Sequence, residues 1–194
     1  MSRLSDIAGD GGDAIPAVPF FYLRHGETDW NRRGVLQGST DIPLNAAGIA
    51  QAQAAAGRLT GLGIVSVVSS PLGRARVTAE IVAAALGLPV EFEPDIAEVS
   101  WGSREGTPEE DVIRRWLAGE TPEAGEPLAG FLARVRRGLS LSLARPAPVL
   151  VVAHGGVFRA LRTLFGLPEA ARVENARPLR LAPGPAGWRI EDPA

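Results

Sequence analysis

The chain has 194 residues, of which 45% are hydrophobic, and its formal net charge at pH 7 is −2. This length allows one globular domain with a sizeable core, and the weak negative charge gives no positive field that would attract nucleic acid or an acidic membrane. The absence of cysteine excludes disulfides, thiolate nucleophiles and cysteine metal sites, and it fits a reducing, cytoplasmic environment. All 20 basic side chains are arginine, which also excludes a phosphate-loop lysine and a lysine general base.

The N-terminal segment has the composition of a flexible leader. Residues 1–18 contain several glycines and acidic residues and no apolar core of a secretory signal, and no run of about 18 apolar residues occurs anywhere in the chain. Residues 19–194 are expected to form a single domain. Within that domain the pattern weakens between residues 104 and 127, where we predict a small lid region.

Apolar spacing along the rest of the chain alternates between strand and helix patterns. A buried strand is predicted at residues 18–23, then a polar loop at residues 28–40, then a helix whose N-cap is Asn45. Ser70 is predicted to cap the next helix, with Pro71 as its first residue. The remaining predicted elements are strands at residues 64–68, 89–92, 149–153, 178–181 and 188–190, and helices at residues 109–117, 127–143 and 157–165.

Alternating strands and helices indicate the α/β class. We predict a three-layer α/β/α sandwich with a largely parallel central sheet, covered by helices on both faces. In such folds ligands bind beyond the carboxyl ends of the strands. His25 follows the first predicted strand and His154 follows the fourth, and these are the two histidines of the chain. Both therefore lie where a binding site is expected.

His25 is the candidate nucleophile. It stands between Arg24, a permanent cation, and Gly26, which lets the backbone approach a ligand closely. Phosphoryl transfer requires a positioned nucleophile and positive or N–H donors around the phosphate oxygens. A neutral imidazole is a competent nucleophile, and nearby arginines would lower its pKa and keep it neutral.

Arg74 is predicted in the first turn of a helix, where the helix dipole disfavours a cation. A tolerated surface charge is one interpretation of this position. The other is that an anion binds there, because a helix N-terminus attracts phosphate and arginine binds phosphate through two donors.

His154 begins a His-Gly-Gly run that is typical of the oxyanion loop of some esterases. Such an esterase needs a Gly-x-Ser-x-Gly turn, which is absent. A metal site is also disfavoured, because the two histidines are far apart in the sequence and there is no cysteine. A second histidine in contact with phosphate fits the pattern better.

Glu98 is the candidate general acid. Beside a phosphate site, a partly buried carboxyl group is favoured in its protonated form and can donate a proton to a leaving group. Glu105 follows a few residues later in the same loop, and the residues alone do not decide between the two.

Four separate motifs, in this order, resemble the histidine phosphatase superfamily, which is also called phosphoglycerate-mutase-like. They are Arg-His-Gly at residues 24–26, Gln-Gly at residues 37–38, Ser-Ser-Pro-Leu with Arg74 at residues 69–74, and His-Gly-Gly at residues 154–156. The resemblance extends from about Phe20 to Phe165. It implies an α/β fold and a phosphatase of the small phosphatase branch that uses no metal and no other cofactor.

The resemblance also implies a role for each matching residue. His25 would be the phosphorylated nucleophile, and Glu98 the proton donor. The catalytic set would be completed by Arg24, Arg74 and His154. Phosphate and substrate would be bound by Arg24, Asn31, Gln37, Gly38, Arg74, His154 and Gly155.

The expected function is hydrolysis of a small phosphorylated metabolite through a phosphohistidine. One alternative is a phosphoglycerate-type mutase, although the mutases of this family tend to be longer. The other is a module that binds a phosphorylated ligand without catalysis. We expect no nucleic-acid or membrane partner, and the sequence leaves a homodimer open. Candidate contacts for the rest of the substrate are Arg114, Arg115 and Trp116 in the lid, with Arg32 and Arg33 at the entrance.

Overall fold

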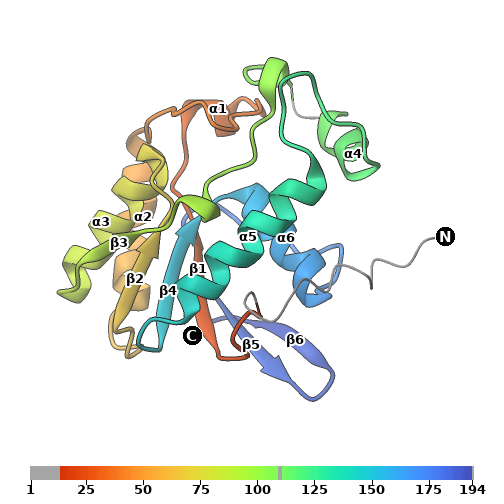
Figure 1. Cartoon of the computed structure of the whole chain (residues 1–194). Coiled ribbons are helices and arrows are strands. Elements are labelled where there is room, and N and C mark those ends of the chain that lie inside the picture. Colours follow the sequence, from red (N-terminus) through yellow and green to blue (C-terminus); the bar gives the residue numbers. More distant parts are fainter. Residues whose placement is uncertain (1–13, 109–110, 194) are drawn as a thin grey trace.

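Six strands form one sheet in the order β3-β2-β4-β1-β5-β6 in the computed structural model of Figure 1, which describes residues 14–108 and 111–193. Strands β1 to β4 pair in parallel, and β5 and β6 extend the sheet beyond β1 in antiparallel order. The predicted α/β fold with a largely parallel sheet is confirmed. The strands are β1 (Phe20–Arg24), β2 (Ser66–Ser69), β3 (Val90–Phe92), β4 (Val149–Ala153), β5 (Leu179–Gly184) and β6 (Gly187–Glu191).

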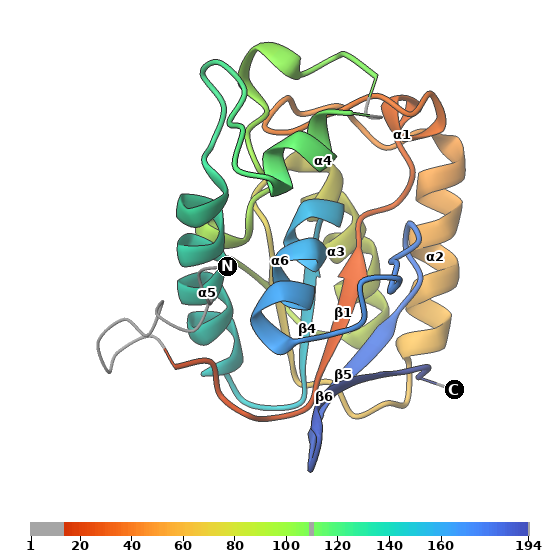
Figure 2. The same cartoon turned by 90° about the vertical axis from the view of Figure 1, so that its right-hand side faces the viewer.

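Helices cover both faces of this sheet, as Figure 2 shows. The first face carries α2 (Ala46–Leu59) and α3 (Gly73–Leu86), and the second face carries α5 (Leu128–Leu143) and α6 (Gly155–Phe165). Two short helices, α1 (Asp29–Arg32) and α4 (Val112–Leu117), lie beyond the carboxyl ends of the parallel strands (Figures 1 and 2). Two short 3-10 helices, η2 (Pro94–Ile96) and η3 (Gly102–Arg104), lie between β3 and α4.

Strand β1 is buried on both faces, which explains its unbroken apolar run. Phe20 and Tyr22 belong to the core beneath α5 and α6, whereas Phe21 and Leu23 belong to the core beneath α2 and α3. Successive side chains of a strand point to opposite faces, so one short run fills both cores. Strand β4 alternates in the same way.

The carboxyl ends of β1 and β4 lie side by side at the centre of the sheet. Arg24 is paired with Ala153, and the backbone amide of His25 donates to the carbonyl oxygen of Ala153 at 3.0 Å. The next residue of each strand is therefore a histidine at the same edge. The sequence-based expectation that His25 and His154 meet there agrees with this register.

The start of α3 differs from the prediction. The helix begins at Gly73 rather than at Pro71, and Ser70 is not its N-cap. The carboxylate of Asp41, from the preceding loop, accepts the hydrogen bond of the Gly73 amide at 2.7 Å. The cap is thus supplied from more than 30 residues away, while the Ser70 hydroxyl pairs with His154.

Two other boundaries also move. The segment predicted as a loop over residues 28–40 contains α1, because the Thr28 hydroxyl accepts from the Asn31 amide and the Asn31 side chain accepts from the Thr28 amide. Helix α6 begins at Gly155 rather than at residue 157, so the two glycines that follow β4 belong to its first turn.

The structure describes only the last five residues of the predicted leader, which spans residues 1–18. Residues 1–13 lie outside the described residues. Beyond them, the Ser140 hydroxyl of α5 donates to the carbonyl oxygen of Ala14 at 3.1 Å, and Ile15 and Val18 pack against the core. The segment 14–18 is therefore attached to the domain.

Candidate active site

The imidazole of His25 is held in one orientation. Its Nδ1 atom lies 2.7 Å from the carbonyl oxygen of Gly26. A carbonyl oxygen can only accept, so Nδ1 carries the proton and Nε2 keeps a free lone pair. Burial, followed by the charges of Arg74 and Arg24, lowers the pKa of His25 well below its usual value. The ring is therefore neutral near pH 7 and can act as a nucleophile.

The backbone around His25 is fixed from several directions. The Gly26 amide donates to the Thr78 hydroxyl at 3.0 Å, and the Asn175 side chain donates to the His25 carbonyl oxygen at 2.9 Å. A Cβ atom on Gly26 would lie 2.4 Å from the carbonyl oxygen of Gly48. Only glycine permits this close approach of the loop to α2.

His154 lies beside His25, with 5.2 Å between the ring centroids. Its Nε2 atom pairs with the Ser70 hydroxyl at 2.7 Å, and its carbonyl oxygen accepts from the Tyr22 hydroxyl at 2.7 Å. Among the described residues, Nδ1 of His154 has no hydrogen-bond partner although it is buried. Burial, Arg74 and His25 lower its pKa well below the usual value. The ring of His154 is therefore also neutral near pH 7.

Arg74 projects from the first turn of α3 and is only 1% exposed. One terminal nitrogen donates to the Thr40 carbonyl oxygen at 2.9 Å, and the other donates to the Gly38 carbonyl oxygen at 2.7 Å. These two carbonyl contacts orient the guanidinium group without neutralising it. The half-exposed Asp41 carboxylate forms an ion pair with it, with 3.7 Å between Nη1 and Oδ1. The predicted first-turn position of Arg74 agrees with the structure.

Two side-chain amides present N–H groups to the same space. The Asn31 oxygen accepts hydrogen bonds from Thr28 at 3.1 Å and from Asn175 at 3.3 Å. The Gln37 oxygen accepts from the Thr28 hydroxyl at 2.9 Å. Because both oxygens are taken by protein donors, the NH₂ groups are left to donate to an anion.

The two candidate acids have different surroundings. Glu98 lines the cavity, and its carboxylate accepts the backbone amides of Val99 and Gly156, each at 3.0 Å. Glu105 accepts from the amides of Ser39, Thr40 and Trp101 and from two hydroxyls.

Partial burial raises the pKa of Glu105, but the hydrogen bonds from Thr40, Ser39 and Trp101 outweigh burial, so that its pKa lies below the usual value. It is not among the cavity-lining residues. The geometry therefore favours Glu98 as the acid and makes Glu105 an anchor for the loop of Gly38.

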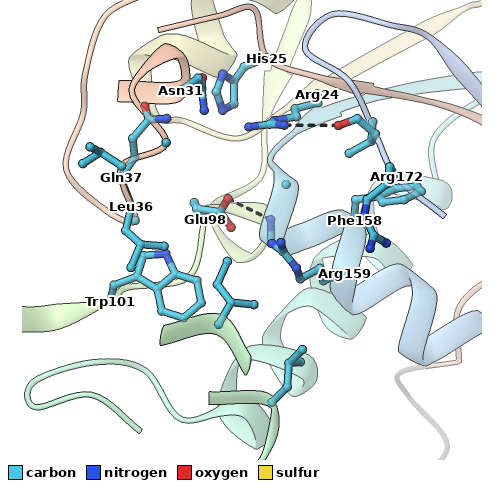
Figure 3. Close-up of a pocket in the computed structure, with 18 of the residues that line it drawn as sticks. Arg24, His25, Asn31, Leu36, Gln37, Glu98, Trp101, Phe158, Arg159 and Arg172 are labelled. Atoms are coloured by element: carbon cyan, nitrogen blue, oxygen red, sulfur yellow. Dashed lines mark hydrogen bonds between the residues drawn. The ribbon is translucent and has the colours of Figure 1, made fainter. Parts of the chain in front are cut away.

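A cavity of about 780 Å³ joins these groups. Figure 3 shows Arg24, His25 and Asn31 at one end, with Glu98 across from them. The predicted residues that line the cavity are Arg24, His25, Asn31, Gln37, Gly38, Arg74, Glu98 and Gly155. His154 lies behind this wall and is fully buried.

The structure places only some of the predicted outer substrate contacts at the cavity. Arg33 and Arg114 line the cavity. Arg32 and Arg115 do not line it, and instead form exposed ion pairs with Asp29 and Glu120. Trp116 is a core residue with 1% exposure, stacked edge-on against Trp101 and Phe131. The sequence predicted a helix that includes Trp116, but it named this residue as a substrate contact rather than as part of the core.

Some residues of the site carry no sequence motif of their own. Asn175 comes from the loop before β5, and the segment around it closes over the end of β1, where the Ala176 amide donates to the Arg24 carbonyl oxygen at 2.9 Å. The Arg24 side chain donates to the Val173 carbonyl oxygen at 3.3 Å. Ala176 has a positive φ of 47°, which marks a turn that its residue type does not predict.

Within the described residues, no three His, Asp or Glu side chains are grouped as metal ligands. Within the same residues, no helix is both long enough and apolar enough to cross a membrane.

Comparison with known proteins identifies the class to which this fold and site belong. The model of the histidine phosphatase superfamily (branch 1) matches residues 20–192, so the chain belongs to that family. The family prediction is therefore confirmed. The match extends beyond the predicted range of resemblance and includes the loop of Asn175.

Several relatives cover nearly all of the domain. A protein of Yersinia enterocolitica named "Probable phosphoglycerate mutase" is 39% identical, over 88% of this chain and 90% of that protein. An uncharacterized phosphatase of Bacillus subtilis is also 39% identical, over 88% of this chain and 91% of that protein. These names include both a phosphatase and a mutase, the two activities that the motifs left open.

Solved structures agree with the fold. A mycobacterial glucosyl-3-phosphoglycerate phosphatase in complex with VO₃ has a TM-score of 0.79 at 29% identity, over 90% of this chain and 98% of that chain. A structure named mycobacterial hydrolase 1 has a TM-score of 0.78 at 30% identity, over 90% of this chain and 96% of that chain.

Proposed function

We propose that the protein is a metal-independent phosphatase that hydrolyses a small phosphate monoester through a phosphorylated His25. The observation that carries this proposal is the hydrogen bond of 2.7 Å between Nδ1 of His25 and the Gly26 carbonyl oxygen. It leaves the Nε2 lone pair directed at a space that also holds Arg24, Arg74 and Asn31. The family and the phosphatases among its relatives support the same reaction.

In the first step, Nε2 of His25 forms a bond to phosphorus as the bond from phosphorus to the ester oxygen breaks. The protonated carboxyl group of Glu98 gives its proton to the leaving oxygen. The phosphorylated ring becomes positively charged, and its Nδ1–H remains bonded to the Gly26 carbonyl oxygen. Arg24, Arg74 and the amides of Asn31 and Gln37 donate to the phosphate oxygens and stabilise the charge that develops on them.

In the second step, the Glu98 carboxylate accepts a proton from water as the water oxygen attacks phosphorus. The bond between phosphorus and Nε2 breaks, which releases inorganic phosphate and returns His25 and Glu98 to their starting forms. General acid and base assistance of this kind contributes roughly 10²–10⁴-fold. The positive charge for the reaction comes from arginine, so the proposal requires no metal.

A rapid-quench experiment tests the intermediate. Enzyme that is mixed with substrate and quenched in base should carry one phosphate on His25, as measured by mass spectrometry. This phosphate should be lost in acid, as expected of a phosphoramidate. His25→Asn should carry none and should not turn over. Activity should be unchanged by EDTA. Phosphate found on a serine or an aspartate, or activity that returns only with a divalent ion, would contradict the proposal.

A mutase is the second candidate, favoured by the name of the Yersinia relative. The two functions differ in the acceptor of the phosphoryl group. In water labelled with ¹⁸O, a phosphatase releases inorganic phosphate that contains one labelled oxygen. A mutase instead returns the phosphoryl group to an organic acceptor without label. A ligand-binding module would bind inorganic phosphate but would turn over no ester at all.

We further propose that the enzyme is cytoplasmic, that residues 19–194 form one domain, and that residues 104–127 act as its lid. The absence of cysteine supports the location, and the position of α4 over the carboxyl ends of the strands supports the lid (Figure 2). A homodimer stays a prediction, which analytical ultracentrifugation of the full chain tests.

A further inference from the structure

One side chain of α5 binds the loop that carries Glu98. Arg134 donates from one terminal nitrogen to the carbonyl oxygens of Asp95 at 3.0 Å and of Ala97 at 2.7 Å. Its other terminal nitrogen donates to the carbonyl oxygen of Glu98 itself at 3.0 Å. Backbone carbonyl groups that are withdrawn from water need such partners, because leaving them unpaired is costly. One arginine therefore holds the backbone that leads from η2 to the proposed acid.

The remaining donors of Arg134 bind the carboxylate of Glu126. The Nε atom donates to one carboxylate oxygen at 2.6 Å, and a terminal nitrogen donates to the other at 2.7 Å. Every N–H group of the guanidinium fork thus has an acceptor, two in the carboxylate and three in the loop. This planar arrangement is specific to arginine, since a lysine ammonium carries its donors on a single atom.

Helix α5 is shaped to receive this loop. A Cβ atom on Gly138 would lie 2.8 Å from Cβ of Asp95, so the glycine permits η2 to approach the helix closely. Gly138 lies one helical turn beyond Arg134, on the same face of α5. The guanidinium carbon of Arg134 lies over the ring of Phe131, 4.7 Å from its centroid. The orientation of the guanidinium group is therefore set by the helix as well as by its acceptors.

Glu126 connects this arrangement to the proposed lid, residues 104–127. Its carbonyl oxygen accepts from the indole nitrogen of Trp116 in α4 at 2.8 Å. Its backbone amide donates at 2.8 Å to the carbonyl oxygen of Ser100, which follows the proposed acid in the same loop. The carboxylate that aligns Arg134 therefore belongs to a residue that also contacts α4 and the loop of the acid.

Arg134 does not reach the substrate. It is not among the described residues that line the cavity, and its side chain is only 17% exposed. Glu98 does line the cavity, and its carboxylate accepts from the Gly156 amide of α6 at 3.0 Å. The acid is thus fixed at both ends, its backbone by α5 and its carboxylate by α6. A general acid must lie within hydrogen-bond distance of the leaving oxygen, and a misplacement of about 1 Å costs roughly 10²-fold in rate.

We propose that Arg134, aligned by Glu126, is a positioning residue for Glu98. It holds the backbone of the loop at the distance from α5 at which the carboxyl group reaches the leaving oxygen. This inference rests on the proposed phosphatase function, and it adds the contact through which the lid and the proton donor of that site are joined.

The test compares two esters, butyl phosphate and p-nitrophenyl phosphate. The butyl oxygen needs a proton in order to leave, whereas nitrophenolate does not. The ratio of the two kcat/KM values, alkyl over aryl, measures the contribution of the acid, because kcat/KM reports the steps up to the phosphoenzyme. We expect Arg134→Met to lower this ratio by about tenfold or more. Arg134→Lys keeps the charge but not the planar fork, so it should restore only part of the ratio.

A double-mutant cycle shows whether Arg134 acts through Glu98. In Glu98→Gln the acid is already absent, so the addition of Arg134→Met should change the ratio by no more than about twofold. Arg145→Met is the matched control and should leave the ratio unchanged. Arg145 is also partly buried and pairs with a glutamate, Glu91, at 3.1 Å, but it lies beyond the far end of α5. An equal loss for both esters in Arg134→Met, or effects that multiply in the cycle, overturns the inference and keeps the phosphatase.

Nuclear magnetic resonance gives a measurement that needs no turnover. The amides of Val99 and Gly156 both donate to the Glu98 carboxylate. If the carboxylate is displaced, these amides lose their acceptor, so their proton resonances should move upfield in Arg134→Met. They should stay in place in Arg145→Met. Unchanged resonances in Arg134→Met overturn the inference.

The remaining outcomes separate the inference from the proposed function. If Arg134→Met does not fold, Arg134→Lys and Glu126→Gln replace it in both measurements, with a smaller loss expected, and an unchanged ratio with unchanged resonances in both overturns the inference. A wild type that hydrolyses neither ester overturns the proposed phosphatase, and the resonances then decide alone whether Arg134 holds Glu98.

Discussion

The carboxylate of Glu98 accepts a hydrogen bond at 3.0 Å from the backbone amide of Gly156, in the first turn of α6. The same glycine leaves no room for a larger residue, because a Cβ atom there would lie 2.2 Å from Oε1 of Glu98. The nearest atom belongs to the end of a flexible side chain, so the carboxylate rather than the helix would move. The position of the proposed acid is therefore set by a glycine that follows His154.

We predict that Gly156→Ala lowers kcat for alkyl phosphates by about 10-fold or more, because a displaced Glu98 loses part of the roughly 10²–10⁴-fold that general acid catalysis contributes. The fold should persist, since Ala favours a helix by about 1 kcal/mol over Gly. Steady-state kinetics and a thermal melt measure the two effects. Gly57→Ala, in α2 with no atom within 4 Å of the added Cβ, is the matched control and should keep full activity.

The second prediction separates Glu98 from Glu105. Glu98→Gln should reduce hydrolysis of alkyl phosphates far more than formation of the phosphoenzyme from p-nitrophenyl phosphate, because nitrophenolate leaves without a proton. The phosphoenzyme should then accumulate, since activation of water is also lost. Quenched-flow kinetics with both classes of ester measure this difference.

Glu105→Gln should behave differently. The side chain accepts hydrogen bonds from Ser39, Thr40 and Trp101, and an amide group would place N–H donors against some of these donors. We expect a lower melting temperature and a similar loss of rate for both classes of ester. If Glu105→Gln instead shows the dependence on the leaving group and Glu98→Gln does not, Glu105 is the acid.

Glu98 and Glu105 also show where the sequence stops being informative. Both lie between η2 and α4, on either side of η3. Each has a carboxylate oxygen 2.2 Å from the place of a Cβ on a glycine, Gly156 for Glu98 and Gly38 for Glu105. Those two glycines are distant in the sequence from the acids they face. Only the packing of the loop decides which carboxylate enters the cavity.

The main features of the fold were predictable because they depend on local pattern. Apolar runs buried on both faces gave β1 and β4, and their parallel pairing places His25 and His154 together. The cap of α3 was not predictable, because Asp41 reaches the Gly73 amide from a distant loop, and the Ser70 hydroxyl, which accepts from the Leu72 amide at 3.3 Å, also pairs with His154. Asp41 and Ser70 can both accept a hydrogen bond from the first turn of a helix, and only the tertiary structure decides which of them caps α3.

The third prediction concerns Asn175, which no motif indicates. Its side-chain amide donates to the His25 carbonyl oxygen and to the Asn31 side-chain oxygen. Asn175 therefore positions both residues, although it does not line the cavity itself. Asn175→Ala should lower kcat and weaken inhibition by inorganic phosphate, because the Asn31 amide is no longer held. It should also cost about 1 kcal/mol of stability for each lost hydrogen bond.

Asn45→Ala is the control for this effect. Asn45 caps α2 by accepting from the Gly48 amide at 2.8 Å, so its loss should cost about 1 kcal/mol of stability. Its kcat should nevertheless stay close to that of the wild type. A role of Asn175 in stability alone predicts the same behaviour for both variants, with no change in phosphate inhibition.

The last prediction concerns the pH dependence of stability. His25 and His154 are the two histidines of the chain, and burial lowers the pKa of each in the folded protein well below the usual 6.5. Below pH 6.5 the unfolded chain therefore binds protons that the folded protein does not bind. Stability must fall as pH decreases through this window, by up to about 1.4 kcal/mol per pH unit for each histidine.

Urea unfolding between pH 7.5 and 5.0 measures this slope. The wild type should lose up to about 2.7 kcal/mol per pH unit below pH 6, since two histidines contribute. His25→Asn should reduce the slope by about half, because one buried imidazole is then absent. Glu105 acts in the same direction, because its pKa in the folded protein is also lowered. The stability that it contributes is lost only as the pH falls below the usual glutamate pKa of 4.5, which lies outside this window. An unchanged slope in His25→Asn would mean that this ring is protonated as readily in the folded protein as in the unfolded chain, and would remove the electrostatic basis for a neutral nucleophile.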